Sequence, residues 1–306
     1  MKQNKLWKHF KLKRYSIGEI IASYGFLLPA LIFITAWIIY PLLQSFLMSF
    51  QDVDLLNFSQ RKFIGFENYS QLFQDPRFVR SLKTTVIFVA VVVPIQSGFA
   101  LIIATLLNQI NRLKTFFRTI FFIPYVISTV AVTVVFMRLF TKGGILTELF
   151  AKFGLPDVTW FANMNLALPF LSIIYLWMNF GFYTLLFLTG LQTVPSEVYE
   201  AAAIDGANVF RRFWNITIPM LRPFTLLVLA TGIISAFQIF DQAYVLSRGG
   251  TLGSPAGATM TMVVFIYAQA FRYNNLGYGN AAAILLLVIV LGVTLLLRKG
   301  FKEEIN

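Results

Sequence analysis

Six long stretches of this sequence contain no charged residue, and they restrict its fold more than any other feature. Each stretch can hold the roughly 20 apolar residues with which an α-helix crosses about 30 Å of hydrocarbon. A charge at the centre of such a helix would cost about 2.5–3.5 kcal/mol. The uncharged stretches therefore mark candidate membrane spans, and they cover residues 20–51, 84–111, 119–137, 158–196, 223–240 and 273–297.

Composition favours a membrane protein built from helices. Of the 306 residues, 58% are hydrophobic and only 12% are charged, which is unlike a soluble domain of this length. A closed β-barrel also satisfies its backbone in lipid, but its strands alternate in polarity and these stretches do not. The sequence predicts an all-α integral membrane protein with six transmembrane helices, at about residues 24–50, 84–107, 118–138, 166–190, 223–246 and 278–298.

The distribution of basic residues predicts the orientation. Segments on the side of the two termini carry 15 of the 25 Lys and Arg residues, and the opposite side carries the other 10. The positive-inside rule therefore places both termini in the cytoplasm. Residues 1–19 would form a basic cytoplasmic arm, residues 20–299 the transmembrane domain and residues 300–306 a cytoplasmic tail. The net charge of +12 then reflects topology and attraction to anionic membrane lipid, and we expect no nucleic-acid binding.

Motifs for catalysis and for metal binding are missing from the sequence. It has no cysteine, and its single histidine, His9, has no neighbouring metal ligand. The nucleotide-binding pattern Gly-x4-Gly-Lys-Ser/Thr does not occur. We therefore predict no metal site, no cofactor and no enzymatic activity, so that any ATP hydrolysis belongs to a partner subunit.

A charged interval, residues 192–222, separates the fourth and fifth predicted spans. Glu197 favours the first turn of a short helix, and Gly206 favours a break after it. Phe210 and Trp214 are four residues apart, which predicts a second helix with an aromatic face. In a cytoplasmic loop, such a face is either a docking surface for a partner or a helix lying in the lipid interface.

The order of residues in this loop also resembles a known motif. Glu-Ala-Ala, three residues, Gly, nine residues and Ile-x-hydrophobic-Pro are typical of the membrane subunits of bacterial ATP-binding-cassette importers. The matching residues are Glu200, Ala201, Ala202, Gly206, Ile216, Ile218 and Pro219, where the family usually has Leu at the position of Ile218. Further segments resemble carbohydrate-uptake permeases of the maltose and glycerol-phosphate types, and they include Gly65-Phe-Glu-Asn-Tyr69, Phe121-Phe-Ile-Pro124 and Gly277-Tyr-Gly-Asn-Ala-Ala282.

This resemblance implies a multi-pass protein of the bacterial cytoplasmic membrane that forms half of a path for a sugar or oligosaccharide. Its loop would be a coupling helix seated in a groove of the cytoplasmic ATPase. The residues expected to transmit the motion are Glu200, Ala201, Ala202, Asp205, Gly206, Phe210, Phe213, Ile216 and Pro219. The implied partners are a dimer of ATPase subunits, an extracytoplasmic solute-binding protein and a second homologous permease, which is either a different chain or a copy of this one.

Polar residues inside the predicted spans indicate where a solute would pass, because lipid offers them no hydrogen bonds. In the fifth span, Thr231, Ser235, Gln238 and Gln242 are spaced to form one helical stripe. In the fourth, Asn179 and Tyr183 are four residues apart, with Phe182 available to stack on a sugar ring. Alignment with the maltose-type permeases places most of these residues near that family's substrate contacts. Hydrogen bonding between helices is the alternative role for the stripe.

Two other functions stay open. The same architecture would also suit a non-sugar solute such as a glycerol phosphodiester, although the predicted path contains no basic cluster to bind a phosphate. An ion-coupled carrier would need carboxylates or a basic partner at mid-depth in the membrane. Asp241 is the only acidic residue within an apolar run, which argues against that class.

Overall fold

The computed structural model describes residues 17–110, 113–247 and 250–303, and this part of the chain is mostly helical. It contains one short hairpin, in which the two-residue strands β1 and β2 pair antiparallel. The prediction of an all-α protein is confirmed apart from this hairpin. In order, the elements are α1 (Ile17–Ile34), η2 (Thr35–Ile39), α2 (Tyr40–Met48), β1 (Gln51–Asp52), β2 (Lys62–Phe63), α3 (Glu67–Gln74), α4 (Pro76–Gln109), α5 (Lys114–Val126), α6 (Thr129–Leu139), α7 (Ile145–Ala151), η3 (Trp160–Ala162), α8 (Ala167–Leu191), α9 (Ser196–Ile204), α10 (Val209–Arg212), η4 (Phe213–Thr217), α11 (Ile218–Met220), α12 (Arg222–Phe237), α13 (Asp241–Leu246), α14 (Met262–Tyr267), η5 (Ala268–Arg272) and α15 (Leu276–Glu303).

Five helical segments of the described chain are long and apolar enough to cross a membrane, or six if α5 and α6 count as one. The segment predicted as a single span over residues 118–138 is not a straight helix. Instead, α5 and α6 meet at 92°. The bend lies three residues after Pro124, where Ile127 and Ser128 adopt extended backbone angles that end α5. A proline near the end of α5 favours such a break, because it lacks an N–H for the helical ladder.

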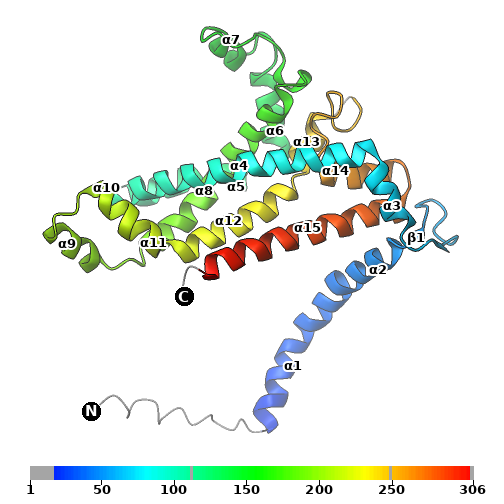
Figure 1. Cartoon of the computed structure of the whole chain (residues 1–306), viewed down its shortest axis with the longest axis horizontal. Helices are drawn as coiled ribbons and strands as arrows, with labels where there is room; N and C mark the ends of the chain where they lie inside the picture. Colours follow the sequence, from blue (N-terminus) through cyan, green and yellow to red (C-terminus); the bar gives the residue numbers. More distant parts are fainter. Residues whose placement is uncertain (1–16, 111–112, 248–249, 304–306) are drawn as a thin grey trace.

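Helices α4, α8, α12 and α15 lie side by side and form the core of the protein (Figure 1). Their facing surfaces bury large apolar side chains such as Phe88, Ile174 and Phe237. Helix α5 packs against α8 at Gly181, where the absence of a side chain lets the backbone of Phe121 approach α8 directly. Glycine thus sets the distance between these two helices.

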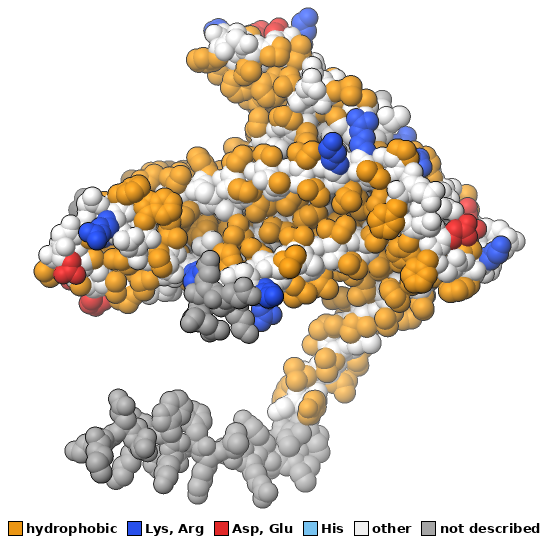
Figure 2. Space-filling view, in the orientation of Figure 1, with side chains coloured by type: hydrophobic (Ala, Val, Ile, Leu, Met, Phe, Trp, Pro, Cys, Tyr) orange, Lys and Arg blue, Asp and Glu red, His pale blue; other side chains and the backbone are white. Residues whose placement is uncertain are grey.

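The outer surface of the helices is apolar, as expected for a protein surrounded by lipid. No residue from Ser23 to Met48 is buried. Helix α1 projects away from the core helices, whereas α2 contacts α15 (Figure 1). Figure 2 shows apolar side chains over the flank of the core helices and along α1 and α2. Charged side chains are sparse on this face and lie mostly toward its edges, among them the regions near α9, β1, α7 and the end of α15.

At the end that carries β1, a polar network fixes the connection between the first two spans. The side-chain amide of Asn68 donates to the carbonyl oxygens of Ser49 (2.9 Å) and Gln51 (3.0 Å) just after α2. The hydroxyls of Ser49 and Tyr69 share a hydrogen bond of 2.7 Å. Asn68 and Tyr69 belong to the Gly65–Tyr69 segment noted in the sequence, so this segment holds the end of the first span.

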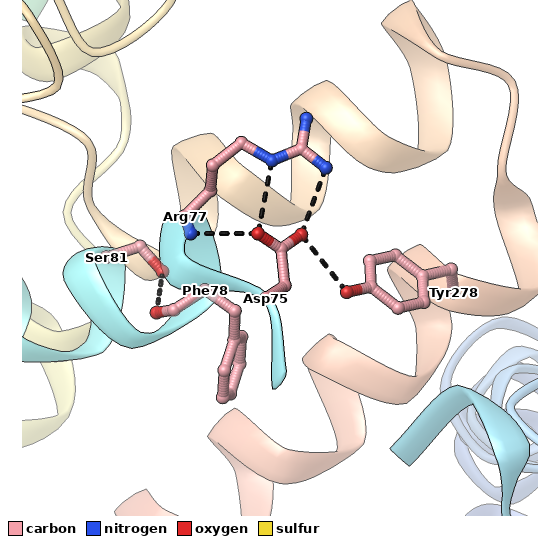
Figure 3. A network of polar contacts seen from close by, with 5 residues as sticks. All are labelled: Asp75, Arg77, Phe78, Ser81 and Tyr278. Carbon is pink, nitrogen blue, oxygen red and sulfur yellow. Dashed lines mark hydrogen bonds and ion pairs between the residues drawn. The ribbon is translucent and has the colours of Figure 1, made fainter. Parts of the chain in front are cut away.

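Asp75 joins α4 to α15 at the same end (Figure 3). Its carboxylate accepts hydrogen bonds from the Arg77 backbone N–H (2.8 Å), from Arg77 Nη2 (3.0 Å) and from the Tyr278 hydroxyl (3.2 Å). Partial burial alone would raise the pKa of this carboxyl. The hydrogen bonds and the positive charge of Arg77 outweigh burial, and the pKa of Asp75 lies below its usual value.

Candidate functional site

The loop between α8 and α12 contains two short helical segments, and the first of them, α9, terminates just before Gly206. Helix α9 ends there in a left-handed residue, with φ of +78° at Gly206. The Gly206 N–H donates to the Ala203 carbonyl (3.1 Å), and the Ala207 N–H donates to the Ala202 carbonyl (2.9 Å). These two bonds form a Schellman motif, which glycine favours because it adopts a left-handed conformation without steric cost.

The second half of the loop, which contains α10 and η4, is hydrogen-bonded to α9 in the first half. Asn208 caps α10, and its side-chain oxygen accepts a hydrogen bond of 2.8 Å from the Arg211 N–H. The helix continues through the π-helical turn η4, which the sequence did not predict. A hydrogen bond of 3.0 Å between the hydroxyls of Tyr199 and Thr217 connects α9 to η4. The two halves of the loop therefore form one connected unit, called here the bracket.

This bracket presents apolar side chains at its surface, at the extreme end of the molecule (Figure 1). The exposed fractions are 87% for Ile204, 72% for Phe210 and 52% for Trp214. The rings of Phe210 and Trp214 contact each other, with centroids 6.0 Å apart. Of the nine residues predicted to couple to an ATPase, six are exposed (Glu200, Ala201, Asp205, Gly206, Phe210 and Pro219) and three are half-buried (Ala202, Phe213 and Ile216).

A second candidate site is a cavity of about 210 Å³ near the middle of the chain's long helices, called here the central cavity. Residues of α5, α8 and the end of α12 line it. Three of the predicted path residues, Asn179, Ser235 and Gln238, are among them. Tyr125 and Thr129 also line the cavity, and neither was among the path residues predicted from the sequence. They flank the bend between α5 and α6, and Pro124 was the one local signal that could have located them.

The polar stripe predicted for the fifth span does not run along one continuous helix. Helix α12 ends at Phe237, and Gln238 is its C-cap. The chain then turns, and α13 begins at Asp241. Gln242 is buried, yet it still lines the central cavity, because the turn brings the start of α13 back toward α8. Thr231 lies deeper along α12, and its hydroxyl donates to the Leu227 carbonyl (2.7 Å).

The remaining predicted path residues support the cavity and do not line it. Tyr183 is 2% exposed and packs among the helices. Phe182 stacks on the ring of Tyr125, with centroids 4.7 Å apart and planes 11° from parallel. Gln96 is fully buried and also lies outside the cavity lining. The side chains that reach the cavity therefore come mainly from one face of α8 and from the break after α12.

Charged groups are scarce around the central cavity. Among the described residues that line it, Asp241 is the only one with a charged side chain. Nowhere in the described residues do three or more His, Cys, Asp or Glu side chains lie close enough to hold a metal ion. The cavity can therefore offer amides, hydroxyls and aromatic rings to a bound molecule.

Comparison with known proteins decides the family. Residues 96–299 match the family described as "Binding-protein-dependent transport system inner membrane component". The chain belongs to this family. The match covers loop 192–222, every residue that lines the central cavity, α12–α14 and most of α15. The resemblance to importer permeases stated from the sequence is thereby confirmed, and the protein is a transport permease with several apolar helices in the membrane.

Relatives match over nearly the whole length of the permease. The "Probable ABC transporter permease protein YesP" of Bacillus subtilis is 36% identical to this chain, and the match covers 91% of this chain and 90% of YesP. An arabinooligosaccharides transport system permease of B. subtilis is 33% identical over 92% and 90%. Among solved structures, a bacterial alginate ABC transporter in complex with an alginate pentasaccharide-bound periplasmic protein has a TM-score of 0.77. The two sequences are 21% identical, and the match covers 92% of this chain and 94% of the transporter chain, which shows a shared fold.

Proposed function

We propose that this permease forms half of the path by which an ATP-binding-cassette importer carries a sugar or oligosaccharide across the bacterial cytoplasmic membrane. The observation that supports a sugar is the lining of the central cavity, where amide, hydroxyl and aromatic groups outnumber the single carboxylate of Asp241. Amides donate and accept hydrogen bonds, as sugar hydroxyls do, and aromatic rings contact the apolar faces of sugar rings. The arabinooligosaccharide and alginate transport systems, to which this chain is similar, agree with this class of solute.

The proposed topology has six spans within residues 20–299, with α5 and α6 together as the third. Both termini, residues 1–19 and 300–306, lie in the cytoplasm. The excess of basic residues on that side supports this orientation. In the structure, loop 192–222 and the end that carries β1 lie at opposite ends of the core helices (Figure 1). The loop would then face the cytoplasm, and the β1 end would face the solute-binding protein.

Loop 192–222 is the proposed contact with a dimer of ATPase subunits. The chain has no nucleotide-binding motif, so a separate subunit has to supply the energy. The loop combines a hydrogen-bonded bracket with exposed apolar side chains, and an exposed apolar surface of this kind is typical of a site that binds a partner protein. The proposed coupling residues are Glu200, Ala201, Ala202, Asp205, Gly206, Phe210, Phe213, Ile216 and Pro219.

The coupling assignment can be tested in the complete transporter, reconstituted in liposomes with its ATPase, second permease and binding protein. Replacing Glu200 with Ala should abolish solute-stimulated ATP hydrolysis while the permease stays inserted. Glu197→Ala is a matched control, because Glu197 is also an exposed carboxylate on α9. If Glu200→Ala and Glu197→Ala retain equal stimulation, loop 192–222 is not the coupling element.

The solute path can be tested in the same liposomes by uptake. The proposed path residues are Asn179, Phe182, Tyr183, Thr231, Ser235 and Gln238. Gln238 is exposed and lies at the break after α12. Gln238→Leu should reduce uptake or change solute preference, because it removes an amide from the cavity lining. Gln96→Leu should have a smaller effect, since Gln96 does not line the cavity. Equal and mild effects would assign the polar stripe to contacts between helices.

A further inference from the structure

Four aromatic residues form a connected cluster beside the central cavity, called here the aromatic cluster. It consists of Phe240, Tyr244, Tyr267 and Phe271. The ring of Phe240 lies 5.2 Å from that of Tyr244 and 5.2 Å from that of Tyr267. The ring of Phe271 lies 5.4 Å from that of Tyr267. The cluster brings the start of α13 against α14 and η5, which are separated from it by more than 20 residues in the sequence.

The cluster links two cavities. Phe240 lines the central cavity. Its neighbours Tyr244, Tyr267 and Phe271 line a different cavity of about 400 Å³, together with Ser247 and Arg272. This second cavity is called the aromatic cavity. Because the Phe240 ring contacts the Tyr244 and Tyr267 rings, the two cavities lie next to each other.

The aromatic cavity has the chemistry of a glycosyl-binding site. Its rings are only partly covered, and Phe271 is 58% exposed. Tyr and Phe rings present flat apolar faces, while the Tyr and Ser hydroxyls at their edges donate and accept hydrogen bonds. Arg272 adds a fork of N–H donors. Among the described residues, no carboxylate forms an ion pair with Arg272, so those donors stay available to hydroxyls or carboxylates of a ligand.

We propose that the aromatic cavity is a second glycosyl subsite, so that this permease takes oligosaccharides whose chain extends from the central cavity over the aromatic cluster. This inference rests on the proposed function. It adds a consequence that the central cavity alone does not give: binding strengthens with chain length until both cavities are filled. A single sugar unit fills one cavity and makes no use of the Phe271 ring.

The test compares solutes of different length in the reconstituted transporter. Uptake is measured for arabino-, malto- and galacto-oligosaccharides of one to six units, with the same binding protein throughout. Any length preference of the binding protein then cancels in the ratio between variant and unmodified permease. Phe271→Ala is the main variant, because an exposed ring can be removed with little effect on folding. Tyr273→Ala is the matched control, since Tyr273 is exposed on the same segment but does not line the aromatic cavity.

The expected result is a loss of uptake that depends on length. Phe271→Ala should lower the uptake of the longer solutes roughly 2- to 10-fold and leave the shortest transported solute unchanged, which corresponds to the loss of one aromatic stacking contact. Tyr273→Ala should change neither. A loss that is equal at every length, or no loss, overturns the second subsite and leaves the proposed function intact. If no sugar in the three series is transported or stimulates ATP hydrolysis, the proposed function fails and this inference fails with it.

Discussion

Gly181 controls how closely α5 approaches α8, and Gly181→Ala is the substitution whose effect the structure defines best. An added Cβ would overlap the carbonyl oxygen of Phe121 and would lie 2.5 Å from its carbonyl carbon. It would also lie 3.3 Å from the backbone nitrogen of Phe122. All three neighbours are backbone atoms, so no side chain can rotate to make room.

The size of the effect follows from the required movement. Carbon atoms in good contact are about 3.5–4.0 Å apart, so the backbone of α5 must move by about 1 Å or more. Overpacking of this kind costs typically 1–3 kcal/mol, and we expect about 3 kcal/mol because the clash is between backbones. Tyr125 lies one turn further along α5 and lines the central cavity, so the movement should also reduce solute uptake.

Thermal unfolding of the purified permease in detergent measures the loss of stability directly. Gly98→Ala on α4 is a suitable control, because no atom lies within 4 Å of its added Cβ. An alanine there should stabilise the helix by up to about 1 kcal/mol, since alanine has the higher helix propensity. The unfolding temperature should therefore fall for Gly181→Ala and stay equal or rise for Gly98→Ala. Equal unfolding temperatures for the two variants would refute the close approach of α5 and α8.

Two further substitutions probe buried and capping polar groups. Gln96→Leu should increase the free energy of unfolding by about 1–3 kcal/mol and so raise the unfolding temperature. The reason is that both polar atoms of the Gln96 amide are buried without a hydrogen-bond partner in the described chain. An unchanged or lower temperature would mean that this amide has a partner. Asp75→Asn should destabilise the permease at neutral pH, because it removes the negative charge that Arg77 and Tyr278 contact. Burial opposes ionisation of Asp75, but its hydrogen bonds with Arg77 outweigh that effect, and the pKa of Asp75 in the folded state is lowered from its usual value. The carboxylate therefore stabilises the fold above the unfolded-state pKa of about 4, and this contribution is lost as the pH falls through the lowered pKa. The difference in unfolding temperature between the unmodified permease and Asp75→Asn should therefore be smaller at a pH below the lowered pKa of Asp75 than at about pH 7. A difference that does not change with pH would contradict this account.

Features that depend on local chemistry could be predicted from the sequence. The uncharged stretches predicted helices because a charge in lipid is costly wherever it occurs, and α4, α8, α12 and α15 lie within or across those stretches. Gly206 predicted a break, and the structure has a Schellman motif there, because that motif needs only one left-handed residue and two backbone bonds.

Features that depend on distant packing could not be predicted. Helical spacing placed Tyr183 beside Asn179 but could not tell which of the two faces the central cavity, and Tyr183 turned out to be buried. The break at Gln238 likewise depends on neighbouring helices. Pro124 favours an end to α5, but it does not determine the 92° angle between α5 and α6. Apolar composition alone does not distinguish a straight helix from two short ones that meet at an angle.

The break at Gln238 shows how a packed neighbour makes an irregular backbone possible within the membrane. Backbone groups freed by a break are tolerated in lipid only if protein satisfies them. Here the buried hydroxyl of Thr261, which precedes α14, donates to the Ile239 carbonyl (3.0 Å) and also accepts from the Val264 N–H (3.4 Å). The Thr261 side chain thus satisfies a backbone carbonyl at the break and also caps the start of α14. Because the break brings Gln238 and Phe240 to the central cavity and α14 carries Tyr267 of the aromatic cluster, both cavities depend on the same junction between α12 and α14.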